Sequence, residues 1–478
     1  MGELGGSGKI SSGKTAEQVL AARGIKPDFT CDQVMVRWTH RHSADMDIYF
    51  VANGEAAATL PYAGRPMLAN CAFRVNGIAP ELWNPETGTM RPAPAYRVAG
   101  GRTHIPLVLG PKESVFVVFR RGNTRRQEDI ITGASRGGKV FLSTVEPAHL
   151  VLQKNIKILR AIYGKPGQPA HLRNVTAIVQ NLVSAGHASF PVVQIAAIGG
   201  DPDPYVVKTL DIQYQVNGRI GHVRFQDGGW VWFPAPGRAA FHQPAMLEAE
   251  NDGSVRAAFT EAGRYQFALA SGRRTAIHVP TVPAPISVAG PWRVTFPAGW
   301  GAPAEIQLQH LIAWNKHPDA GVRYFSGTAE YWTKFVIPSG LLAPKRRIYL
   351  DLGEVAVMAE PTLNGHELGI LWKPPFRVDV TAALQSGRNQ LRIRVTNLWI
   401  NRMIGDEQLP ADCDQAPNGQ LLKWPQWLLD GKPSPTGRFT FTTWRLWGKT
   451  DPLAESGLIG PVKLIIAETA VLVKGNLK

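Results

Sequence analysis

The first residues whose spacing suggests chemistry form a phosphate-loop pattern. Gly8 to Thr15, GKISSGKT, fit GxxxxGK[ST], in which backbone amides and a lysine, here Lys14, bind the phosphates of a nucleotide. That motif requires a buried strand immediately upstream, whereas the preceding MGELGGS is polar and rich in glycine. No apolar strand ending in an aspartate stands out as a magnesium-binding partner. We therefore interpret this segment as a terminal lead-in.

Two pairs of residues have the side chains of metal ligands but form incomplete sets. His40 and His42 alternate in an expected strand, so their side chains share one face. No third ligand can be placed from the sequence, which favours ordinary surface or core histidines. Asp201 and Asp203 resemble the start of a calcium loop, but the neighbouring prolines and the missing downstream carboxylates favour a fixed turn.

Carboxylates in the C-terminal part could serve acid–base chemistry. Hydrolysis of a glycosidic bond normally needs two carboxyl groups that face each other across the bond. Asp379, Asp406 and Glu407 lie in the most distinctive segment, but their spacing does not show that any two face each other. Asp379 is interpreted as the cap of a following helical turn. We assign none of the three as a catalytic acid.

Tryptophans provide the remaining chemical signal, because an exposed indole can stack on the face of a sugar. Six of them are concentrated near the C-terminus: Trp372, Trp399, Trp424, Trp427, Trp444 and Trp447. Most tryptophans in proteins belong to the core. We expect one or two of these six to lie at a ligand site.

Composition narrows the classes of protein and of partner. The 478 residues, of which 44% are hydrophobic, suffice for about three domains. A net charge of +15 could attract acidic polysaccharide, nucleic acid or a membrane surface. The basic residues are scattered and no nucleic-acid-binding motif occurs, so no nucleic-acid partner is expected. No apolar run reaches the roughly 20 residues that span a bilayer, so no membrane partner is expected, and the first residues do not resemble a signal peptide.

The cysteines suggest neither a metal site nor a disulfide framework. Cys31, Cys71 and Cys413 are odd in number, lie far apart in the sequence and form no CxxC pattern. We interpret them as structural thiols.

The elements that must position these residues are mainly strands. Apolar and polar residues alternate over 210–216, 348–352 and 391–395, as in half-buried strands. Asn-Gly pairs at Asn217 and Asn364 predict tight hairpins. One helix is expected from Ala16 to Arg23, and nothing supplies the strand–helix alternation of a (β/α)₈ barrel. The fold class is therefore all-β, with tandem β-sandwich or jelly-roll domains and few short helices.

Composition shifts, including the Pro-rich stretch from Pro280 to Trp292, divide the chain into six segments. They are 1–28, a terminal lead-in with a helix remnant; 29–121, a first β-sandwich; 122–153, a linker; 154–235, a second β-sandwich that could be an insertion; 236–290, closing strands and the Pro-rich linker; and 291–478, a galactose-binding-like jelly roll.

Three long segments carry a family resemblance. They include VRWTHRHSADMDIYFVANG with GRTHIPLVLGPKESVFVVFRR, then AGPWRVTFPAGWGAPAEIQL with YFSGTAEYWTKFVIP, then LNGHELGILWKPPFRVDVTAALQSGRNQLRIRVTNLWINRMIGDEQLP with SGLIGPVKL. In this order, over roughly residues 15 to 121 and 286 to 466, the chain resembles the part of bacterial family 106 glycoside hydrolases, the α-L-rhamnosidases, that follows their catalytic barrel. The last segment also resembles the jelly-roll sugar-binding domain of family 2 glycoside hydrolases.

The resemblance implies a carbohydrate-active protein acting on a rhamnose-containing glycan, with calcium as the family's cofactor and a periplasmic or secreted location common among members. The family's catalytic glutamates lie in the barrel, before the part matched here, so no catalytic residue carries over. We expect an accessory half that supports a separately encoded barrel. The alternatives are a free-standing carbohydrate-binding protein or inactive remnant, and a hydrolase complete in itself.

The family-2-like domain suggests a set of carbohydrate-binding candidates: Asn364, Trp372, Asn397, Trp399, Asn401 and Arg402. In the competing interpretation, Asn397 and Asn401 are satisfied turn residues and Arg402 pairs with Asp406.

Overall fold

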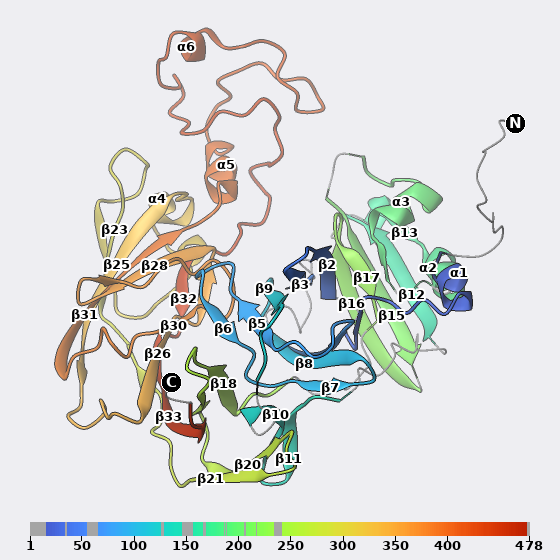
Figure 1. Ribbon diagram of the computed structural model, residues 1–478. Coiled ribbons are helices and arrows are strands. Elements are labelled where there is room, and N and C mark those ends of the chain that lie inside the picture. Colours follow the sequence, from blue (N-terminus) through green and yellow to red (C-terminus); the bar gives the residue numbers. More distant parts are fainter. Residues whose placement is uncertain are drawn as a thin grey trace, which may run out of the picture.

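The computed structural model describes residues 16–33, 36–54, 66–125, 129–145, 156–165, 169–185, 187, 189–204, 207–216, 218–233 and 241–475. The phosphate-loop pattern at 8–15 and the turn residue Asn217 lie outside these ranges. The expected N-terminal helix is confirmed as α1, Ala16–Ala22. With 45% strand and 10% helix, the structure confirms the all-β class (Figure 1).

The first sandwich consists of two antiparallel sheets with a shared core. One sheet has the order β1-β4-β8-β7, with bounds Phe29–Cys31, Met67–Phe73, Arg102–Leu109 and Arg97–Ala99. The other has the order β2-β3-β9-β5-β6, with bounds Val36–His42, Met46–Asn53, Ser114–Arg120, Pro80–Trp83 and Met90–Pro92. Tyr49, Phe73 and Phe119 meet in the core between them.

The next sheet has four strands, two that follow the first sandwich in the sequence and two that come more than 100 residues later. Its order is β11-β10-β20-β21, with bounds Lys139–Ser143, Ile131–Arg136, Gly263–Leu269 and Arg274–Val279. Strands β10 and β11 lie within 122–153, where we had expected a linker; their glycine-rich sequence ITGASRGGK concealed them. Strand β10 pairs with β11 and, across a separation of more than 100 residues, with β20, which a local pattern cannot show.

Residues 156–233 form a sheet that is covered by helices. Its order is β13-β12-β15-β16, with bounds Leu172–Asn174, Ile156–Gly164, Thr209–Val216 and Arg219–Gln226. A smaller sheet pairs β14, Ser189–Pro191, with β17, Trp230–Trp232. Helices α2, Thr176–Ser184, and α3, Val193–Gly199, contribute Val179 and Ile195 to the core of this unit. The division of the chain at 154 and 235 remains a prediction.

The C-terminal jelly roll also has two sheets. The first has the order β18-β19-β33-β26-β30, with bounds Ala245–Ala249, Val255–Phe259, Lys463–Val473, Arg346–Asp351 and Arg377–Asp379. The second has the order β24-β23-β25-β31-β28-β29, with bounds Glu305–Leu308, Trp292–Thr295, Thr328–Ile337, Gly387–Thr396, Met358–Leu363 and His366–Glu367. Short strands β27, Glu354–Ala356, and β32, Gly457–Gly460, pair beside them, and β22, Ile286–Ser287, pairs with β33.

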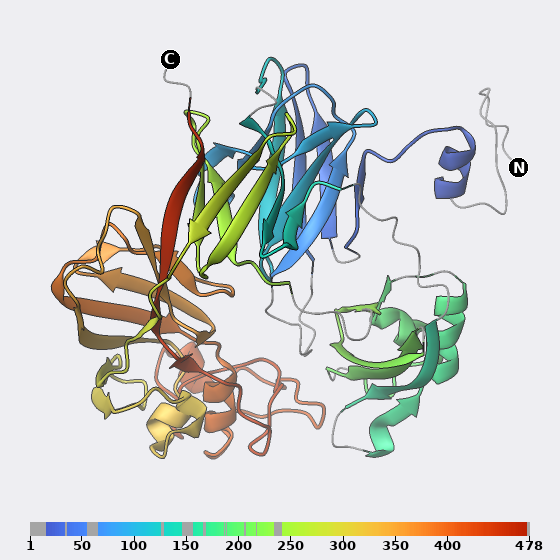
Figure 2. The ribbon, with the colours of Figure 1, turned by 90° about the horizontal axis from the view of Figure 1, so that it is seen from below.

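Strand β33 ties this jelly roll to the sheet of β10, β11, β20 and β21. Leu464 and Ile466, near its start, belong to the jelly-roll core, whereas Leu472 and Val473 belong to the core beneath β20 and β21. Figure 2 shows this last strand running from one layer to the other. The two units therefore share a strand rather than a flexible connection.

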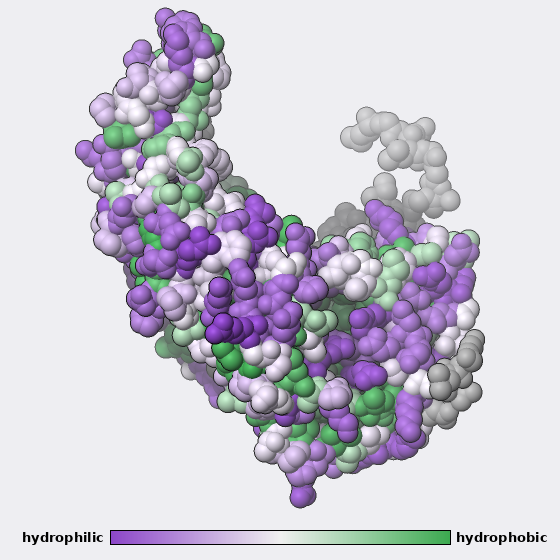
Figure 3. Space-filling view, turned by 90° about the vertical axis from the view of Figure 1, so that its left-hand side faces the viewer, coloured by the Kyte–Doolittle hydropathy of each residue, from purple (hydrophilic) through white to green (hydrophobic). Residues whose placement is uncertain are grey.

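A long excursion, residues 408–456, which we call the arm, follows helix α5, Ile400–Asp406, and its C-cap Glu407. It contains the short helix α6, Gln426–Leu429, and projects away from the sheets (Figure 1). On the face seen in Figure 3, hydrophobic residues are interspersed among hydrophilic ones. Among the described helices, none has the length and apolar character required to cross a membrane.

Candidate carbohydrate-binding groove

An open groove of about 580 Å³ lies where strands β23, β25 and β31 end beside helix α5. Its lining consists of Thr295, Phe296, Pro297, Trp300, Ser326, Gly327, Thr328, Glu330, Arg394 and Trp399. The volume is within the range of about 300–1,000 Å³ that is usual for small-molecule sites. Of the six candidates, only Trp399 is in this lining.

Two indoles supply the apolar surface of the groove. The rings of Trp300 and Trp399 are 5.6 Å apart between centroids and inclined by 55°. Trp399 is 52% exposed, while Trp300 packs against the jelly-roll core and lies 6.5 Å from the ring of Phe439 in the arm. Trp399 is therefore the more accessible of the two indoles and could stack on a ligand, and Trp300 packs it against the fold.

A carboxylate and a guanidinium supply the polar surface. Glu330 of β25 and Arg394 of β31 are directly opposite each other in the antiparallel register. Arg394 Nη1 lies 3.0 Å from Glu360 Oε2, and its Nε lies 3.9 Å from Glu330 Oε1. Because these groups are partly exposed, they can exchange water for the hydroxyls of a sugar, one accepting and the other donating hydrogen bonds.

Asn397 and Asn401 fix the loop that carries Trp399. Asn397 Oδ1 accepts a hydrogen bond from Gly327 N at 2.9 Å, and its Nδ2 donates to Phe325 O at 2.8 Å. Asn401 Nδ2 donates to Ala454 O, and its Oδ1 accepts from Ala454 N, both at 2.8 Å. Both amides are thus satisfied by local partners, as the competing interpretation expected, but Asn401 lies in helix α5 and not in a turn.

Arg402 is buried beneath the groove and paired within its own helix. Its Nε lies 3.1 Å from Asp406 Oδ1, and its guanidinium carbon lies 4.6 Å from the centroid of the Phe439 ring. Burial lowers the pKa of Arg402, while Asp406 opposes that shift. Asp406 Oδ2 also accepts hydrogen bonds from Phe439 N at 3.0 Å and from Thr440 N at 2.7 Å. This pair connects helix α5 to the arm.

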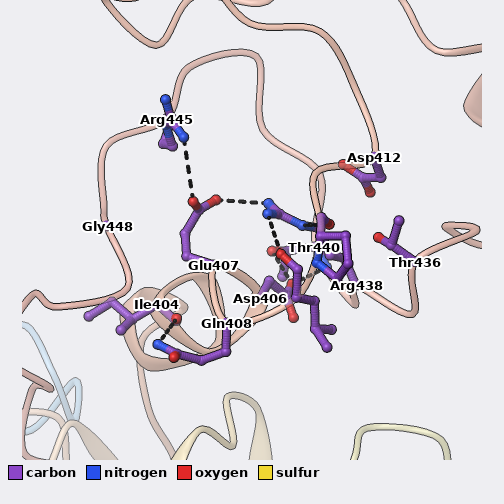
Figure 4. Close-up of polar contacts among 12 residues, drawn as sticks. Ile404, Asp406, Glu407, Gln408, Asp412, Thr436, Arg438, Thr440, Arg445 and Gly448 are labelled. Carbon is purple, nitrogen blue, oxygen red and sulfur yellow. Dashed lines mark hydrogen bonds and ion pairs between the residues drawn. The ribbon is translucent and has the colours of Figure 1, made fainter.

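Glu407, the C-cap of α5, makes a second connection between the helix and the arm. Its Oε1 lies 2.8 Å from Arg438 Nη1, and its Oε2 lies 3.7 Å from Arg445 Nη1 (Figure 4). Asp379 Oδ1 accepts from Thr381 N at 2.9 Å, as expected for the cap of a turn. The three carboxylates considered for acid–base chemistry are therefore each engaged by neighbouring groups.

Asn364 and Trp372 lie outside the lining of the groove. Asn364 has a φ of 52° in the turn between β28 and β29, which confirms that hairpin, and its Nδ2 donates to Asn389 Oδ1 at 2.7 Å. Trp372 is 43% exposed. Its neighbour Lys373 pairs with Glu86 of the first sandwich at 3.2 Å, so this side of the jelly roll faces another domain.

The potential metal ligands have protein partners. His40 and His42 do share a face, where Asp47 Oδ1 lies 3.0 Å from His40 Nε2 and 2.8 Å from His42 Nδ1. Asp201 lies 3.0 Å from the ammonium of Lys208. Within the ranges that the structure describes, no group of three or more His, Cys, Asp or Glu side chains could hold a metal ion. These ranges therefore provide no such site for the calcium that the resemblance implies.

Comparisons with known proteins place this geometry in context. Residues 3–98 match the glycoside hydrolase 106 family, described as alpha-L-rhamnosidase. A protein of Formosa agariphila named "Putative beta-glucuronidase" is 30% identical over 530 aligned residues, which cover 93% of this chain and 44% of that protein. The chain thus spans less than half the length of this curated relative.

Solved structures also match. A rhamnosidase from Novosphingobium sp. PP1Y is 24% identical, with a TM-score of 0.48, over 95% of this chain and 26% of that one. A Bifidobacterium dentium beta-glucuronidase is 23% identical, with a TM-score of 0.27, over 39% of this chain and 30% of that one. The sequence matches relate the chain to family 106 rhamnosidases and to a relative named as a glycoside hydrolase.

Proposed function

We propose that this chain is the accessory, carbohydrate-binding portion of an α-L-rhamnosidase-like glycoside hydrolase. It binds a rhamnose-containing glycan, and a barrel outside the 478 residues hydrolyses the α-L-rhamnoside. The observation that carries this proposal is the groove, in which the exposed indole of Trp399 lies beside the Glu330 and Arg394 pair. The family relation supports a carbohydrate as the ligand.

The chemistry of rhamnose suits such a groove. This 6-deoxy sugar has a methyl group in place of the hydroxymethyl group of a hexose, so one part of its surface is apolar and can pack on an indole. Its remaining hydroxyls can donate to Glu330 and accept from Arg394. Sites of this kind combine an apolar platform with a few polar groups that fix orientation.

The lining of the groove favours binding over hydrolysis. Glycoside hydrolysis uses two carboxyl groups, separated by roughly 5 to 10 Å, across the scissile bond. Glu330 is the one carboxylate in the described lining, and it faces a guanidinium. A hydrolase complete in itself is therefore the weaker alternative, and a free-standing binding protein or inactive remnant shares the same groove.

Isothermal titration with methyl α-L-rhamnopyranoside tests the binding. We expect saturable binding to the full chain and about tenfold weaker binding by Trp399→Ala, because loss of a stacking platform costs roughly 1.4 kcal/mol. Trp424→Ala is the matched control. Trp424 is 53% exposed and has a ring partner, Phe441, at 5.7 Å, yet it lies outside the groove.

Equal affinity of the wild-type and Trp399→Ala proteins would reject the groove as the binding site. Release of p-nitrophenol from p-nitrophenyl α-L-rhamnoside distinguishes the roles of the chain. We expect none from the chain alone and release after mixing with a family 106 barrel. Activity of the chain alone would favour the self-sufficient hydrolase. No release of p-nitrophenol, either by the chain alone or by the mixture, would favour the binding protein or remnant.

A further inference from the structure

Two cysteines that are 40 positions apart in the sequence face each other in the first sandwich. Cys31 of β1 and Cys71 of β4 are direct partners in the antiparallel register. Their Sγ atoms are 3.7 Å apart, a contact between two thiols. We had interpreted these residues as unrelated structural thiols, because sequence separation gives no indication of strand pairing.

The backbone hydrogen bonds show which kind of pair they form. The neighbouring pair is hydrogen-bonded, since Asp32 N donates to Asn70 O at 3.2 Å. In an antiparallel ladder, hydrogen-bonded and non-hydrogen-bonded pairs alternate, so Cys31 and Cys71 form a non-hydrogen-bonded pair. The Cα atoms of such a pair are about 4.5 Å apart, which is inside the range of about 4.4–6.8 Å that a disulfide requires.

We propose that Cys31 and Cys71 are a built-in site of oxidation, at which a low-molecular-weight disulfide such as oxidised glutathione converts the two thiols into a cross-strand disulfide. The thiolate of Cys31 attacks one glutathione sulfur and releases the first glutathione as its thiolate. Cys71 then gives up its proton, and its sulfur attacks Cys31 Sγ of the mixed disulfide and releases the second glutathione. Two cysteine thiols are oxidised, and one oxidised glutathione is reduced to two glutathione molecules.

The surroundings of the two sulfurs assign the order of attack. Cys31 is half-buried, so it is the more accessible of the two thiols to an oxidant, and Gln33 N donates a hydrogen bond to its Sγ at 3.4 Å. Cys71 is buried, and this burial raises the pKa of its thiol. Cys71 therefore acts second, on a sulfur already in contact with it.

A disulfide between Cys31 and Cys71 would link the edge strand β1 covalently to β4. Strand β1 is the edge of its sheet and pairs only with β4 there, through three residue pairs. A covalent link between Cys31 and Cys71 closes the chain between β1 and β4 and restricts the unfolded state. Cys413 lies in the arm, on a different element, and takes no part.

Thiol counting on the full-length protein tests this proposal. The protein is incubated with oxidised glutathione or with dithiothreitol, then unfolded and alkylated with N-ethylmaleimide before intact-mass measurement. We expect the three thiols of the sequence to be alkylated after reduction and one, Cys413, after oxidation. Peptide mapping should identify the linked Cys31 and Cys71 peptides, and the oxidised protein should have the higher apparent Tm.

Matched variants separate the pair from the third thiol. Cys413→Ser should still lose two thiols on oxidation and keep the Tm increase, whereas Cys31→Ser and Cys71→Ser should show neither. Three alkylated thiols after oxidation, a glutathione adduct that persists on Cys31, or a bond to Cys413 would overturn the proposal.

Discussion

Replacing Asp406 by Asn should release the arm from helix α5. In the wild-type protein the side chains of Arg402 and Asp406 are only 6% and 3% exposed, and they neutralise each other at 3.1 Å. Asp406 Oδ2 also accepts hydrogen bonds from the backbone N–H groups of Phe439 and Thr440, so one carboxylate contacts both the helix and the arm. Asn leaves a neutral acceptor of similar shape but leaves Arg402 buried without its counter-charge.

The magnitude follows from that burial. Removing one partner of a buried ion pair typically costs 3–5 kcal/mol, and we take about 3 kcal/mol because the amide oxygen can still accept a hydrogen bond. At about 1.4 kcal/mol per factor of ten, local opening of this contact becomes roughly a hundredfold more frequent. The cation–π contact of Arg402 with Phe439 should weaken at the same time.

Hydrogen exchange followed by mass spectrometry measures this opening directly, because the amides of Phe439 and Thr440 donate to the substituted side chain. Their exchange should be about a hundredfold faster in Asp406→Asn than in the wild type. Peptides from β31 should exchange at the wild-type rate.

Glu407→Gln is the control, with a change of less than about tenfold at these two amides, because both of them donate to Asp406 and not to Glu407. Unchanged exchange at the two amides in Asp406→Asn, or equal acceleration throughout β31, would refute the reasoning.

Three further substitutions give separate expectations. Glu330→Gln should weaken methyl α-L-rhamnopyranoside binding about tenfold, measured by titration calorimetry, because a charge-assisted acceptor is lost; unchanged affinity would exclude a hydrogen bond to the ligand. Lys208→Met removes a buried ammonium 3.2 Å from Asp227 and should destabilise residues 156–233 by about 3 kcal/mol, seen as faster exchange in β15. Burial raises the pKa of Asp211, but hydrogen bonds from partners that include His222 lower it by more, so the net pKa is below the usual value. The ionised Asp211 therefore stabilises the folded protein above about pH 4, and this stabilisation is lost as the pH falls through the lowered pKa. Asp211→Asn should therefore flatten the decline of Tm below about pH 4, and a decline as steep as that of the wild type would contradict this assignment.

Local periodicity was sufficient to predict two strands of the jelly roll, β26 and β31. Leu391, Ile393 and Val395 alternate in the sequence and are all fully buried in β31, as the pattern indicated. The Asn364 hairpin followed from the same kind of signal, because a tight turn needs a residue that tolerates positive φ. Pairings between strands that are far apart in the sequence, such as β10 with β20, depend on tertiary contacts, and no local sequence pattern predicted them.

The candidate site was only partly predictable. Trp399 was named from its residue type, but Trp300 was not, because it lies in a turn about 100 positions earlier and meets Trp399 only in the folded chain. Glu330 and Arg394 were missed for the same reason, although both occupy outward positions of alternating strands. The pairing of Arg402 with Asp406, which the competing interpretation expected, is confirmed, but the helix α5 that brings them together was not expected from the sequence.

The groove lined by Trp300 and Trp399 is proposed to hold a rhamnose unit, and a crystal of the full chain soaked with methyl α-L-rhamnopyranoside would reveal whether it does. We expect difference density for one sugar ring packed on Trp399, with hydroxyls within hydrogen-bonding distance of Glu330 and Arg394. Density for the sugar elsewhere, with this groove empty at a saturating concentration, would contradict it.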